Sequence, residues 1–105
     1  MFAVIGTEVY LAELGKWPTA DRQAAEKLPG RLAQNPWSGT SLGLPFFREK
    51  RVRGQRIYYL VYEDLKMVLL VATSGKKDQQ ITIEYVKQRL SEFRRVAEDV
   101  AKRVA

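Results

Sequence analysis

The chain has 105 residues, a formal net charge of +6 and a pI near 9.8, and 46% of its residues are apolar. This length suits one soluble globular domain with a single core, and no apolar stretch is long enough to span a membrane. The absence of cysteine and histidine excludes disulfides, thiolate chemistry, histidine-based triads and the usual zinc sites.

The remaining side chains limit the chemistry and point to an anionic partner. Any catalysis would have to use Lys, Arg, Tyr, Asp, Glu, Ser or Thr, or a borrowed metal. A basic balance of this size favours nucleic acid as the partner. No charged-then-apolar leader with a small-residue cleavage site opens the sequence, so we expect a cytoplasmic protein.

The N-terminal third predicts a strand followed by two helices. Residues Phe2–Ile5 form a short apolar strand. Thr7 is a suitable N-cap for a helix that ends at Gly15. A second helix opens at Thr19, and a Pro-Gly pair should kink or break it near Leu28.

The middle of the chain predicts a three-stranded antiparallel meander, because its apolar runs are rich in β-branched and aromatic residues and are separated by short polar turns. The tyrosines of its second strand are expected to pack within the sheet. The strands are Phe46–Val52, Ile57–Tyr62 and Met67–Ala72, joined by turns at Arg53-Gly54-Gln55 and Glu63–Lys66.

Positive charge gathers on the first strand of this meander, at its first turn and at its exit. A single acid, Glu49, lies among the cations. The alternative is a solvated strand face on an ordinary basic protein, but the clustering favours a site for a polyanion. The cations are Arg48, Lys50, Arg51, Arg53, Arg56, Lys76 and Lys77.

A long final helix is predicted after the polar segment Asp78-Gln79-Gln80. Its apolar positions recur at spacings of four and three residues. We expect the first half of this stripe to pack on the sheet, while the second half, residues 94–105, is free to protrude and to serve a partner or a dimer. The positions are Val86, Leu90, Phe93, Ala97, Val100 and Val104.

The order β-α-α-β-β-β-α predicts a single α+β domain over residues 1–105. It would have a small antiparallel sheet, made of the N-terminal strand plus the meander, packed against an N-terminal helical pair and closed by a long C-terminal helix. We expect the core at about residues 1–90 and a helical extension at about residues 91–105.

This order, together with several local phrases, resembles the RelE/ParE toxin superfamily, and within it the RelE-type mRNA interferases. The resemblance covers about residues 1–90. The phrases that carry it are Leu14-Gly15 at the end of the first helix, Leu32-Ala33-Gln34-Asn35-Pro36 at the end of the second, Leu42-Gly43 before the basic strand, Arg56-Ile57-Tyr58-Tyr59 in the next strand, and Gly75-Lys76-Lys77 after the last.

The resemblance implies a toxin of a type II toxin–antitoxin system that cuts mRNA on the ribosome without a metal or another cofactor. In this family the ribose 2′-hydroxyl attacks the adjacent phosphate and leaves a cyclic phosphate. By resemblance, Arg56 faces the scissile phosphate, Lys50 accepts the 2′-proton, and Lys77 or Lys76 protonates the leaving oxygen. We would then expect Arg56→Ala to abolish cleavage and leave folding intact.

The register of the basic strand decides which of its side chains meet RNA, because a shift of one residue exchanges the two faces. In one alignment Arg48 and Lys50 take the family's pair of basic positions. In the other, Glu49 and Arg51 do, and Glu49 becomes a carboxylate base. The residues expected to bind RNA are Arg48, Arg51, Arg53, Lys76 and Tyr85.

Two other functions stay open, a ParE-like toxin that poisons DNA gyrase and a non-catalytic protein of the same fold that binds nucleic acid or the ribosome. The dense basic strand favours RNA cleavage. The resemblance implies a small RelB-like antitoxin as a partner, beside the ribosome and mRNA. The apolar seam from Phe93 to Val104 would suit docking of that antitoxin or a homodimer.

Overall fold

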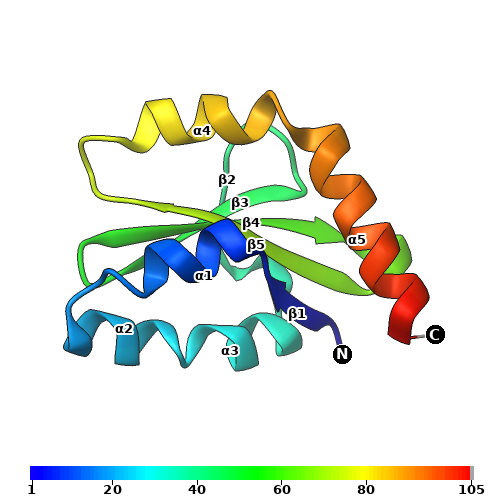
Figure 1. The fold of residues 1–105 in the computed structure, drawn as a ribbon, viewed down its shortest axis with the longest axis horizontal. Helices are drawn as coiled ribbons and strands as arrows, with labels where there is room; N and C mark the ends of the chain where they lie inside the picture. The colour runs from blue at the N-terminus through cyan, green and yellow to red at the C-terminus, as the bar shows by residue number, and fades with distance from the viewer. Residues whose placement is uncertain (105) are drawn as a thin grey trace.

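The computed structural model describes residues 1–104 and has an α+β fold in three layers, with a five-stranded sheet between two groups of helices (Figure 1). The predicted fold class is therefore confirmed. The strand order is β1-β5-β4-β3-β2. The strands are β1 (Ala3–Gly6), β2 (Thr40–Ser41), β3 (Phe47–Val52), β4 (Gln55–Tyr62) and β5 (Met67–Ser74).

The three predicted meander strands are present as β3, β4 and β5, but the sheet is mixed and not wholly antiparallel. Strand β1 runs parallel to β5, with Ala3 opposite Met67. The prediction of an antiparallel sheet is wrong at this pair. A parallel neighbour requires a crossover connection, and here the chain between the two strands includes three helices. The two-residue edge strand β2 was also not predicted.

Three short helices cover one face of the sheet, where two were expected: α1 (Glu8–Leu14), α2 (Thr19–Ala25) and α3 (Leu28–Gln34). The Thr7 hydroxyl accepts a hydrogen bond from the Tyr10 amide, which confirms the predicted N-cap. The break near Leu28 is also confirmed. Pro29 lies in the first turn of α3, where its missing N–H costs nothing.

Two helices cover the opposite face, α4 (Gln79–Lys87) and α5 (Leu90–Val104), so the predicted long C-terminal helix is present as α5, but its apolar stripe extends over two helices instead of one. No Gly or Pro marks the break. A guanidinium N–H of Arg89 donates to the Tyr85 carbonyl at 3.1 Å, while the Arg89 amide turns to the Val86 carbonyl. The side chain thus satisfies the carbonyl that a continuous helix would pair with the amide.

Helix α5 lies along the sheet, and this includes the second half of the predicted helix, which was expected to protrude. Ala97 is fully buried, and Val100 packs against the same core. Arg94 donates to both carboxylate oxygens of Asp64, at 3.0 and 2.6 Å, and this contact holds the pKa of Asp64 below its usual range. None of the helices among residues 1–104 is long and apolar enough to cross a membrane.

The sheet separates two apolar cores. One lies under α4 and α5 and contains Tyr58 and Tyr62, and the other lies under α1 to α3 and contains Tyr59. All three tyrosines are buried, so their predicted packing role is confirmed. Strand β4 is buried on both faces, so it holds the polar residues at its N-terminal end in fixed positions.

The turn between β3 and β4 is tighter than predicted and sets the pairing of these two strands. Its two central residues, Arg53 and Gly54, have positive φ angles of 51° and 84°, the pattern of a type I′ turn. Val52 then pairs with Gln55, and Arg51 pairs with Arg56. Two cations are therefore held on one face of the sheet beside the turn.

Candidate active site

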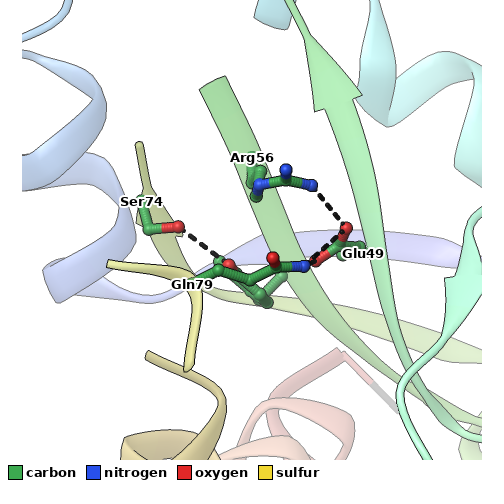
Figure 2. A network of polar contacts seen from close by, with 5 residues as sticks. Glu49, Arg56, Ser74 and Gln79 are labelled. Atoms are coloured by element: carbon green, nitrogen blue, oxygen red, sulfur yellow. Dashed lines mark hydrogen bonds and ion pairs between the residues drawn. The ribbon is translucent and has the colours of Figure 1, made fainter. Parts of the chain in front are cut away.

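A buried ion pair lies between the sheet and the first turn of α4 (Figure 2). An Nη1 N–H of Arg56 on β4 donates to Oε1 of Glu49 on β3 at 2.8 Å. The two residues are only 6% and 5% exposed. Gln79, the first residue of α4, donates to both carboxylate oxygens of Glu49, at 3.3 and 3.0 Å. Three elements thus hold one carboxylate.

The strand register brings this pair together. Glu49 is paired with Tyr58 and Arg51 with Arg56, so these four side chains share the α4 face of the sheet. This arrangement corresponds to the alternative in which Glu49 and Arg51, and not Arg48 and Lys50, lie on the face of Arg56. Lys50 is paired with Ile57 and lies on the opposite face. The structure therefore does not place Lys50 on the same face of the sheet as Arg56.

The hydrogen bonding of this buried pair is incomplete. The Nε atom of Arg56 is buried and has no hydrogen-bond partner among residues 1–104. An unsatisfied buried donor is costly, and such groups in native proteins usually mark a strained or functional position. The unsatisfied Nε–H therefore marks Arg56 as a candidate functional residue.

A second polar pair lies beside the first and comes from β4 and β5. The hydroxyls of Tyr58 and Ser74 are 2.8 Å apart (Figure 2). Burial raises the pKa of Tyr58, although the Ser74 hydrogen bond partly offsets it. The Tyr58 hydroxyl is therefore protonated at neutral pH, and it cannot act there as a proton-accepting phenolate.

A β-bulge directs Ser74 to this place. The register of β5 against β4 shifts after Tyr58, and the successive residues Val71 and Ala72 both pack in the core under α4 and α5. Bulges of this kind change which face the following side chains occupy. Ser74 then shares the face of Tyr58, which strict alternation from Met67 would not allow.

A groove of about 480 Å³ opens in front of Glu49 and Gln79. We call it the active-site groove. Lys50 and Arg51 of β3 line one part of it, and the loop before β2 lines another. The groove gives solvent access to a carboxylate that is otherwise almost fully buried. The residues on this side are Ser38 and Gly39 before β2, Thr40 in β2 and Leu42 after it.

Arg48, expected to bind RNA, has a structural role in holding this loop. Its guanidinium donates to the carbonyls of Trp37, Gly39 and Pro45 at 2.8 to 3.1 Å. It also lies 5.7 Å from the centre of the Trp37 ring. Because these bonds use all three of its nitrogens, Arg48 fixes the groove wall and has little capacity left for RNA.

The close approach of this loop to the sheet predicts a strong effect of a small substitution. A Cβ at Gly39 would lie 2.4 Å from the Glu49 carbonyl oxygen and 2.5 Å from the Tyr59 hydroxyl. We expect Gly39→Ala to lower the free energy of unfolding by about 1–3 kcal/mol in urea denaturation, as overpacking does. In the control Gly30→Ala, where nothing lies within 4 Å, the helix should be stabilised. Equal effects of the two substitutions would contradict the tight contact.

The remaining predicted site residues lie outside the Glu49–Arg56 ion pair. Arg53 pairs with Asp21 of α2 at 2.8 Å and so ties the turn to the helical layer. Lys76 and Lys77 are exposed in the segment between β5 and α4. Tyr85 is half-buried under the Arg89 guanidinium, 4.0 Å from its ring centre, and does not line the active-site groove.

Two polar contacts were missed by sequence analysis. Gln79 had been read only as part of a polar spacer, because nothing local to it indicates that its amide reaches β3. Ser74 follows an unpredicted bulge.

Among residues 1–104, no group of three or more acidic side chains could hold a metal ion.

Comparisons with known proteins place the fold. No protein-family model matches the chain, and no curated protein matches it. Solved structures do match. A double mutant of the E. coli toxin RelE in the free state superposes with a TM-score of 0.70 at 19% identity, covering 83% of this chain and 96% of that one. The isolated E. coli RelE toxin gives 0.65 at 20% identity, covering 84% and 98%.

An archaeal RelE–RelB complex from Pyrococcus horikoshii matches with a TM-score of 0.60 at 17% identity, covering 71% of this chain and 94% of that one. These matched structures include bacterial and archaeal proteins, and the superposition covers at least 94% of each matched chain. The chain therefore has the RelE toxin fold, as the resemblance in its sequence implied.

Proposed function

We propose that this chain, with its RelE toxin fold, is the toxin of a type II toxin–antitoxin system and cuts mRNA on the ribosome. The observation that carries the proposal is the active-site groove, which is lined by the exposed cation Arg51 and by Glu49, the carboxylate that Arg56 holds in a buried ion pair. A gyrase-binding toxin has no need of a carboxylate and an arginine held together beside a groove.

Cleavage by the ribose 2′-hydroxyl needs a proton acceptor, stabilisation of the phosphorane charge and a proton donor for the leaving 5′-oxygen. Both Glu49 and Lys50 line the groove, but we assign the first role to Glu49, because it shares a face of the sheet with Arg56 and is oriented by two donors. Arg56 contributes charge and its unpartnered Nε–H. Attack forms the bond from O2′ to phosphorus, breaks the bond to O5′, and uses no metal.

Lys77, with Lys76 beside it, is the proposed proton donor. Both lysines are exposed and lie between Ser74 and Gln79, the two residues that flank the buried cluster. Losing a general acid typically slows a reaction by about 10²–10⁴-fold. We therefore expect Lys76→Ala/Lys77→Ala to reduce message cleavage by at least two orders of magnitude with little change in stability.

The test is induced expression in growing cells, with primer extension on a translated message. The wild type should arrest growth and produce new 5′ ends inside the reading frame, and the double variant should not. Lys102→Ala, which removes an exposed cation from α5, is the control that should cut normally. Arrest without new 5′ ends would favour a ParE-like target, and no arrest would favour a non-catalytic binding protein.

A RelB-like antitoxin is the partner that we propose, because several of the matching structures are toxin–antitoxin complexes. A groove of about 400 Å³ between α1 and the last two helices supports such docking. Val9 and Val96 line it and are 48% and 41% exposed. The seam from Phe93 to Val104, which was expected to suit the antitoxin or a homodimer, is largely used internally, since Ala97 and Val100 pack on the sheet.

A further inference from the structure

A third groove, of about 240 Å³, lies between α3 and the free end of β3. We call it the α3 groove. Leu28 and Val52 are among its apolar lining residues. Four cations line it: Lys27 and Arg31 from the helical layer, and Lys50 and Arg51 from the strand.

The charge of the α3 groove is not balanced by the protein. No acidic side chain lines it, and none of the four cations forms an ion pair within 4 Å among residues 1–104. Arg53, in the turn that follows β3, differs from these four cations because it forms an ion pair with Asp21. Like charges held close together repel, so this arrangement favours a bound polyanion.

The α3 groove continues from the active-site groove. Lys50 and Arg51 line both grooves, so the two grooves adjoin along the edge of β3. Strand β2 pairs with β3 only at Arg48 and Glu49, which leaves the edge of β3 open from Lys50 onward. A chain of phosphates crossing this edge would pass from Glu49 to Lys50 and Arg51 and then reach α3.

We propose that the α3 groove binds backbone phosphates of RNA that flank the cleavage point, with Lys27 and Arg31 as phosphate-binding residues. Lys50 then binds phosphate and does not accept a proton, which agrees with its place on the face away from Arg56. The identity of the polyanion as RNA rests on the proposed function. Lysine and arginine side chains that neutralise phosphates give binding a salt dependence that can be counted.

The experiment measures binding of an uncleavable 2′-O-methyl RNA by fluorescence anisotropy at several salt concentrations. The probes are a single-stranded 20-mer and a hairpin of the same length. Each neutralised phosphate contributes about 0.7 to the salt slope for single strands and about 0.9 for duplexes. Lys27→Ala/Arg31→Ala should therefore reduce the slope by about 1.4 or 1.8 and weaken binding. The matched control Arg95→Ala/Lys102→Ala removes the same charge from α5, on the other face of the sheet.

A smaller salt slope of the Lys27→Ala/Arg31→Ala variant with the 20-mer would support flanking message as the source of the phosphates. A smaller slope with the hairpin alone would support folded RNA as the source. An unchanged slope with both probes, an equal loss in the control, or no binding of the wild type at low salt would overturn the proposal. Because the probes cannot be cut, a wild type that binds them through this groove but leaves messages intact would refute only the endoribonuclease assignment. A wild type that cuts messages while the double variant keeps its slope would refute only the α3 groove.

Discussion

Replacing Glu49 by alanine is expected to lower the free energy of unfolding by about 3–5 kcal/mol, the usual effect of removing one partner from a buried ion pair. The substitution would leave the Arg56 guanidinium in a site only 6% exposed, with its one bound acceptor gone. Gln79 would also lose its acceptor. Urea denaturation of the purified variant measures the change.

Two controls separate the buried pair from ion pairing in general. Asp64→Ala breaks an exposed pair with Arg94, and it should change stability far less. The double substitution Glu49→Ala/Arg56→Ala removes both charges and should recover part of the lost stability. If Glu49→Ala and Asp64→Ala had similar effects, Glu49 and Arg56 would not be a buried pair in solution.

Replacing Arg56 by lysine is expected to reduce message cleavage by about 10²–10³-fold while keeping most of the stability. A lysine retains a positive charge for Glu49 but lacks the planar fork that can serve a carboxylate and a phosphate at once. The magnitude is that of losing one preorganised donor to a developing oxyanion. Primer extension measures the cleavage and thermal unfolding measures the stability.

The lysine variant is a better test than Arg56→Ala. The sequence predicted that alanine here would leave folding intact, but that expectation took no account of the buried Glu49 carboxylate. Loss of activity in Arg56→Ala would therefore mix catalysis with unfolding. A folded Arg56→Lys protein that cuts at the wild-type rate would remove Arg56 from the mechanism.

Local signals predicted those parts of the fold that depend on neighbouring residues. The hydroxyl of Thr7, the Pro29 break and the turn at Arg53-Gly54 each act within a few residues, and the structure has all three, although the turn is one residue shorter than predicted. The direction of β1 depends instead on where it meets β5, far away in the chain. The break before Leu90 depends on Arg89, an ordinary helix former whose side chain happens to cap the preceding turn.

The candidate site was predicted in composition but not in arrangement. The basic residues were identified from their clustering, yet their roles follow from the faces of β3, which a single residue of register decides. Arg48 supports a loop and Lys50 lies near α3, while the acid between them lies beside Arg56. Gln79 could be connected with Glu49 only after the position of α4 was known.

The parallel pairing of β1 with β5 has a consequence for the order of folding. The hairpins of the meander close over a few residues, whereas Ala3 finds Met67 only after most of the domain has been made. Closing a longer loop costs more chain entropy, so contacts between distant residues tend to form later. The strand that leaves the ribosome first is therefore expected to be among the last to reach its native position, and a nascent chain that has not yet reached β5 cannot complete this fold.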